Sequence, residues 1–159
     1  MSATESSQLE GTALDAWRAY LQSHATILRA LNAALLAEQG MTTRDYEVLL
    51  YLSHAPDHRL PMSALAARTM LTRSGITRLV DGLVAAGFVE RTACSQDARI
   101  SYAQLTDDGY AKLRSAGCSH VASIRSLFLE HFTAEETALL AGLLGRLPGA
   151  QQGGSCTAE

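Results

Sequence analysis

Hydroxyl and guanidinium side chains that can hydrogen-bond to nucleic acid are concentrated in one segment near the middle of the chain. They stand at the start of a predicted helix: Thr72, Arg73, Ser74, Gly75, Thr77 and Arg78. Arginine can bond to guanine edges or to phosphates, hydroxyl groups can bond to either, and glycine permits close approach of the backbone. The alternative is a solvated face, on which Arg78 pairs with neighbouring carboxylates and Arg73 is a surface charge. The shared helix and its flanking pattern favour contact with DNA.

Two further arginines belong to a predicted hairpin that follows this helix. Arg99, at the hairpin tip, could enter a narrow minor groove, whose negative potential attracts guanidinium groups. Arg91, at the end of the first hairpin strand, has two interpretations that the sequence leaves open. It bridges to phosphate, or it braces the hairpin.

A second group of side chains could line an aromatic ligand pocket. Trp17, Tyr20 and His24 share the first predicted helix, and Tyr46 lies on the second. Aromatic walls with a few polar groups are typical of small-molecule pockets. The alternative is that these residues belong to the core.

The cysteines form neither a metal pattern nor a disulfide pattern, because they are widely spaced and lack a C-x-x-C pair: Cys94, Cys118 and Cys156. The histidines supply no convincing set of three or four ligands, so no metal or cofactor is expected. Cys94 lies near the hairpin arginines, which makes thiol-oxidation sensing an alternative function. No G-x-S-x-G, H-E-x-x-H or paired-carboxylate arrangement suggests an enzyme.

Composition limits how the chain could bind nucleic acid. The 159 residues are 47% hydrophobic and 18% charged, with a formal net charge of -3, which suits one globular domain. Bulk positive charge is absent, so a nucleic-acid site must be local. The sequence has no apolar stretch long enough to span a membrane and no signal peptide, which predicts a cytoplasmic protein.

Apolar spacing predicts the elements that must position these side chains. A stripe in steps of three and four, from Leu14 to Leu35, predicts a long helix that ends at Gly40 and packs against another helix. A short helix is expected after Pro61, and extended runs at 88–92 and 100–105 predict a hairpin. Further helix starts are predicted at threonine N-caps: Thr42, Thr72, Thr106 and Thr133.

The predicted fold is mainly α with a small β-hairpin wing. A winged helix-turn-helix over 43–105 is framed by N- and C-terminal helices over 9–39 and 107–148, and the segments 1–8 and 149–159 are expected to be disordered. In such a fold a polar helix can enter the major groove while the hairpin reaches the adjacent minor groove.

Five short motifs occur in a specific order: Leu65-Ala66, Thr77-Arg78-Leu79-Val80-Asp81, Gly87-Phe88-Val89-Glu90-Arg91, Asp97-Ala98-Arg99 and Leu105-Thr106-Asp107-Asp108-Gly109. Together they resemble the MarR family of bacterial transcriptional regulators, over about residues 12–147. The resemblance implies a homodimer whose terminal helices form the dimerisation region and whose winged lobes bind double-stranded DNA at a palindromic operator. It further implies a repressor that is released by a small, often phenolic ligand or by thiol oxidation.

The resemblance also assigns roles to single residues. It places the polar residues from Thr72 to Arg78 at the positions of the recognition helix that face DNA, and it makes Asp97 the carboxylate that orients Arg99 for the minor groove. Two departures concern affinity rather than fold: Ala98 replaces a second wing arginine, and Gly82 replaces a longer, often basic residue. A winged-helix module for protein interaction is the alternative function.

Overall fold

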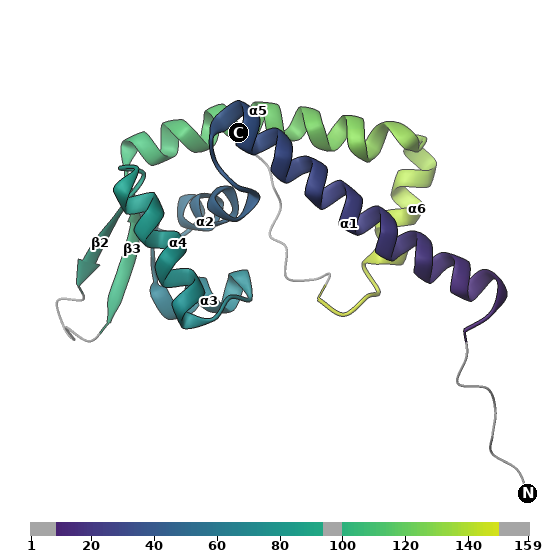
Figure 1. The fold of residues 1–159 in the computed structure, drawn as a ribbon, viewed down its shortest axis with the longest axis horizontal. Helices are drawn as coiled ribbons and strands as arrows, with labels where there is room; N and C mark the ends of the chain where they lie inside the picture. The colour runs from purple at the N-terminus through teal and green to yellow at the C-terminus, as the bar shows by residue number, and fades with distance from the viewer. Residues whose placement is uncertain (1–8, 94–99, 150–159) are drawn as a thin grey trace, which may run out of the picture.

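The computed structural model describes residues 9–93 and 100–149. Several residues named above lie outside these ranges: the segments predicted to be disordered, apart from Gly149, together with Cys94, Asp97, Arg99 and Cys156. Figure 1 shows long helices along one side of the molecule and a compact unit of short helices with a small sheet beneath them.

The predicted long helix is confirmed as α1, Gly11–Gln39. Gly40 ends it in the left-handed conformation, at φ 65°, where its N–H donates to the Leu36 carbonyl. Glycine adopts this conformation without the steric penalty of a Cβ. The buried residues of the helix are Leu31 and Leu35, near its C-terminal end, so the apolar stripe is largely uncovered over the N-terminal half.

Three shorter helices form the compact unit: α2, Thr43–Ser53; α3, Met62–Thr69; and α4, Arg73–Ala85. The Thr42 and Thr72 hydroxyls cap α2 and α4 by accepting from the backbone N–H three residues on, at 3.1 Å in both cases, as predicted. Apolar faces of the three helices meet in one core, whose largest fully buried members include Val48, Leu49, Leu52, Leu65, Ile76 and Val80.

The sheet contains one strand more than the predicted hairpin. The hairpin strands are β2, Val89–Ala93, and β3, Ser101–Leu105, which pair antiparallel with Val89 opposite Leu105. A third strand, β1, Arg59–Pro61, follows the short helix η1, Pro56–His58, and pairs with the other edge of β3. The order is β1-β3-β2, so β2 is an edge strand.

The helices α5, Asp107–Leu127, and α6, Ala134–Leu144, follow the sheet and are separated by the short helix η2, Leu129–His131. The predicted caps are confirmed, since Thr106 accepts from Gly109 N and Thr133 accepts from Glu136 N. Thr106 also ties α5 to the end of α4, because its hydroxyl donates to the Gly87 carbonyl at 2.7 Å. Figure 1 shows α5 running from the sheet to the opposite end of the molecule, where α6 turns back.

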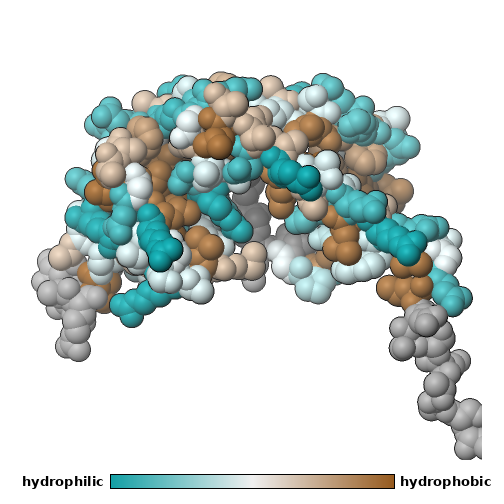
Figure 2. All heavy atoms as spheres, in the orientation of Figure 1, coloured by the Kyte–Doolittle hydropathy of each residue, from teal (hydrophilic) through white to brown (hydrophobic). Residues whose placement is uncertain are grey.

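Large apolar side chains are exposed on the helices outside the compact unit. On α1 they include Trp17, Leu21 and Leu28, and on α6 Leu139 is 63% exposed beside the exposed Leu143. Figure 2 shows apolar residues reaching the surface at the end of the molecule where α1 begins. No helix in the described ranges combines the length and the apolar character that crossing a membrane would require.

Candidate nucleic-acid interface

The helix α4 buries one face and exposes the other. Ile76, Val80 and Leu83 pack into the core, while Thr72, Arg73, Ser74 and Arg78 are exposed. The start of the exposed face is held by the N-cap, where Thr72 Oγ1 accepts from Gly75 N and lies 3.2 Å from Ser74 Oγ. A Cβ at Gly75 would come within 3.2 Å of that same oxygen, so glycine suits the tight first turn.

Arg73 and Arg78 form no ion pair with any residue that the structure describes. The alternative that Arg78 pairs with neighbouring carboxylates therefore has no support among the described residues. Thr77 is half-buried, and its hydroxyl donates to the Arg73 carbonyl at 2.8 Å, so it retains only acceptor capacity for a further ligand. Guanidinium groups that are exposed on a helix and form no ion pair with a described residue can bind phosphates or base edges.

Arg91 differs from these two arginines because it is paired. Its Nη2 donates to Asp81 Oδ1 at 2.8 Å and lies 3.5 Å from the Thr77 carbonyl oxygen. Asp81, the partner of Arg91, was given no role from the sequence. The signal was present in its spacing, because Arg73, Thr77 and Asp81 recur every four residues and so share one face of α4.

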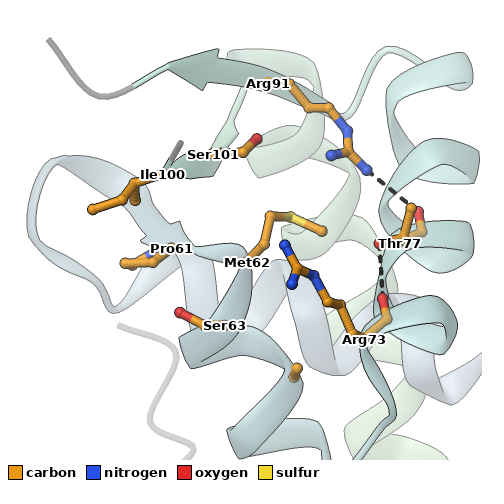
Figure 3. A pocket seen from close by; sticks show the side chains of 9 residues that line it. Pro61, Met62, Ser63, Arg73, Thr77, Arg91, Ile100 and Ser101 are labelled. Atoms are coloured by element: carbon orange, nitrogen blue, oxygen red, sulfur yellow. Dashed lines mark hydrogen bonds between the residues drawn. The ribbon is translucent and has the colours of Figure 1, made fainter. Parts of the chain in front are cut away.

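A hollow of about 430 Å³ lies between α3, the start of α4 and the two hairpin strands. Its lining includes Met62, Arg73, Thr77, Arg91 and Ile100. Figure 3 shows the guanidinium groups of Arg73 and Arg91 approaching it from two sides, with Arg91 directed at Thr77. The polar face of α4 and the wing are therefore parts of one concave surface.

The other predicted wing residues, Asp97 and Arg99, lie outside the described residues, as does Cys94. The remaining cysteine in the described ranges, Cys118, is exposed and has a free thiol. No group of three or more potential metal ligands occurs in the part of the chain that the structure describes.

The four predicted aromatic ligand residues fall into two groups. Trp17, Tyr20 and His24 stack along exposed α1, with ring centroids 6.0 and 5.8 Å apart. Tyr46 instead meets His120 of α5, with ring centroids 4.7 Å apart. The Nδ1 atom of His120 is buried and has no hydrogen-bond partner among the described residues, and burial lowers the pKa of this imidazole. Sequence reasoning missed His120, because the contact joins helices that are distant in the chain.

Comparisons with known proteins agree on the class of protein to which this chain is similar. A family model described as the MarR family matches residues 39–100. The chain is 35% identical over 111 residues to the transcriptional repressor YetL of Bacillus subtilis, covering 70% of this chain and 66% of that relative, just under two thirds. It is 31% identical over 121 residues to the regulator PecS of Dickeya dadantii, covering 75% and 71% of the two chains.

Two solved structures from Streptomyces coelicolor share the fold. AbsC, a MarR family regulator, superposes with a TM-score of 0.80 at 32% identity, over 87% of this chain and 93% of that chain. Sco3205, a MarR family regulator solved in complex with DNA, gives 0.81 at 30% identity, over 92% and 94%.

The capped polar helix, the sheet and these neighbours define a winged helix-turn-helix DNA-binding protein. More specifically, the chain belongs to the MarR family. Its relatives are named as transcriptional regulators, and the chain is a DNA-binding transcriptional regulator of this family.

Proposed function

We propose that the protein is a homodimeric repressor that binds a palindromic operator through α4 and the wing. The observation that carries the proposal is the exposed face of α4, where Arg73 and Arg78 have no ion-pair partner among the described residues. Unpaired arginines on a helix that fits the major groove need little rearrangement to bind DNA. Thr72, Ser74, Gly75 and Thr77 support them from the same helix, and Asp97 and Arg99 are proposed to act at the wing.

Dimerisation is supported by the apolar surface of α1 and α6. Trp17, Leu21 and Leu28 on α1, with Leu139 and Leu143 on α6, are exposed in the single chain. An exposed patch of this kind is typical of a protein interface, and symmetric dimers are the commonest assembly. The helices over 9–39 and 107–148 are therefore proposed as the dimerisation region. Two-fold symmetry would place half-sites about 10 bp apart.

Release of the repressor is proposed to follow binding of a small aromatic ligand between the dimerisation helices and the DNA-binding unit. Trp17, Tyr20 and His24 supply stacking surfaces on α1, and Tyr46 lies where α2 meets α5. A ligand releases DNA only if it binds more tightly to a dimer geometry that no longer matches the operator.

The experiment uses a labelled duplex that the wild-type protein selects from a randomised pool. Replacing Arg78 with Ala should weaken binding about 10- to 100-fold if it contacts a base edge. Arg114→Ala, an exposed change on α5, is the matched control and should leave affinity unchanged. Equal binding by wild type and Arg78→Ala in a salt titration would contradict the site. Absence of any duplex binding at low salt would favour the protein-interaction alternative.

A further inference from the structure

We propose that Asp81 is a positioning residue for DNA binding, whose carboxylate holds Arg91 and thereby fixes the wing against α4. The inference rests on the proposed function, because it assigns a role within the same DNA-binding surface. It also decides between the two interpretations of Arg91 in favour of bracing.

The contact joins two elements that bind different grooves in the proposed complex. Arg91 lies in β2, and its Nη2 donates to Asp81 Oδ1 at 2.8 Å and lies 3.5 Å from the Thr77 carbonyl oxygen. Thr77 and Asp81 are one helical turn apart, so the guanidinium group lies along one face of α4. Among the described residues, the other two ion pairs join neighbouring positions, Arg44 to Glu47 and Arg59 to Asp57, whereas this one joins elements ten residues apart in the chain.

The sheet itself does not hold β2 in this position. In the order β1-β3-β2, β2 pairs with β3 on one side and with no strand of the described ranges on the other. The twist between two strands is less tightly fixed at the edge of a small sheet, where its value varies widely, and the short β1 pairs only with the far edge of β3. A side-chain tie from β2 to α4 therefore restricts a motion that the backbone ladder leaves open.

The pair is better suited to orientation than to stability or direct phosphate contact. The Arg91 and Asp81 side chains are 33% and 60% exposed, and ion pairs at such exposure contribute little to the free energy of unfolding. A phosphate bound by Arg91 would also lie near the Asp81 carboxylate, which repels it. No carboxylate among the described residues pairs with Arg73 or Arg78, so a phosphate that binds there meets no such repulsion.

Asp81→Asn tests the role through the sign of its effect. If Asp81 only adds negative charge to the surface that binds DNA, its neutralisation tightens binding. If it positions the wing, its neutralisation weakens binding, which we expect to be about 3- to 10-fold. Glu90→Gln removes the same charge from an exposed residue of β2 that has no ion pair with a described residue. This control should bind equally or slightly more tightly.

A double-mutant cycle measures affinity for the same selected duplex. It adds two variants, Arg91→Ala and Asp81→Asn/Arg91→Ala. A positioning pair predicts that Arg91→Ala weakens binding as Asp81→Asn does, that the double variant is no weaker, and that the salt dependence is unchanged. A direct phosphate contact predicts instead that Arg91→Ala lowers the salt slope by about 0.9. The charge-reversed pair Asp81→Arg/Arg91→Asp should recover part of the affinity. Circular dichroism of each variant checks its folding.

Tighter or unchanged binding by Asp81→Asn, or a reduced salt slope for Arg91→Ala alone, would overturn the positioning role while leaving the proposed function intact. If Arg78→Ala binds like wild type, or if the wild type selects no duplex, the proposed function fails and this inference fails with it.

Discussion

The side-chain carbonyl oxygen of Asn32 in α1 accepts hydrogen bonds from both the backbone N–H and the hydroxyl of Thr43, at 3.0 and 3.2 Å. Thr43 begins α2, so one amide joins the long helix α1 to the first helix of the compact unit. The N–H groups in the first turn of a helix lack partners within that helix, and Asn32 supplies one from another element.

Removing this amide should reduce stability, because it leaves a half-buried backbone donor without its acceptor. Asn32→Ala is expected to lower the free energy of unfolding by about 1 kcal/mol, measured by urea denaturation. Asn32→Asp keeps the acceptor and places negative charge at the N-terminus of α2, where the helix dipole favours it. This variant should be as stable as wild type, and an equal loss in both variants would contradict the assigned role.

Two helical glycines should respond to alanine in opposite directions. Gly82 in α4 has open space where a Cβ would be, so Gly82→Ala should stabilise the fold by about 0.5–1 kcal/mol through its higher helix propensity. At Gly109 in α5 a Cβ would overlap the Phe88 carbonyl oxygen and lie 2.9 Å from Leu105 Cδ1. Gly109→Ala should cost about 2–3 kcal/mol. Thermal unfolding gives the melting temperature of each variant relative to wild type. A shift of the same sign in both variants would refute the packing argument.

Met70 holds a conformation that is unfavourable for its side chain. It follows α3 with φ 53°, in the left-handed region, and is 87% exposed. Met70→Gly should therefore stabilise the fold by about 1 kcal/mol. Ala86 caps α4 in the right-handed region, so Ala86→Gly is the control and should lose stability. A lower melting temperature for Met70→Gly would show that the exposed side chain makes a stabilising contact.

Stability should fall in mild acid because of His120. Burial lowers the pKa of its imidazole in the folded chain. In the unfolded chain the imidazole has its ordinary pKa of about 6.5, so it binds a proton more readily there. This penalty is absent above the unfolded pKa and grows as the pH falls through it. His120→Phe keeps a ring against Tyr46 and should reduce the loss of stability between about pH 7 and pH 5. Identical curves for wild type and His120→Phe would exclude His120 as the cause.

The dimerisation proposal predicts a change in mass for a variant of α6. Leu139→Glu adds charge at a side chain that is 63% exposed in the single chain, so it should not harm a monomer but should disrupt an apolar interface. Sedimentation equilibrium should show a shift from dimer to monomer, together with loss of operator affinity because the second lobe no longer binds at high effective concentration. Tyr110→Gln, at an exposed site in the first turn of α5, should remain dimeric. A dimeric Leu139→Glu variant would exclude α6 from the interface.

Most of the fold could be predicted because its signals are local. Thr42, Thr72, Thr106 and Thr133 cap helices through hydrogen bonds to residues three positions away, and Gly40 ends α1 through its own backbone conformation. The strand β1 could not be predicted, because three residues show no alternation and become a strand only by pairing with β3.

The candidate site likewise has residues that could be predicted from the sequence and contacts that could not. The polar face of α4 follows from helical spacing, so Arg73 and Arg78 could be named from the sequence. The state of Arg91 could not, because its partner Asp81 is ten positions away in a different element, and only the packing of β2 beside α4 brings the two together. Tyr46 and His120 are likewise joined only by the packing of α2 on α5.

The hydrogen bond from Thr106 to Gly87 couples movement of α5 to α4, the helix that is proposed to enter the major groove. Gly87 lies just beyond the end of α4, and Thr106 is the residue from which α5 starts. A helix of 21 residues is about 31 Å long, so a tilt of about 5° moves its end by about 3 Å, close to the axial spacing of adjacent base pairs in DNA. In the proposed dimer, a small rotation of α5 would thus be enough to shift each α4 by about one base pair against its half-site.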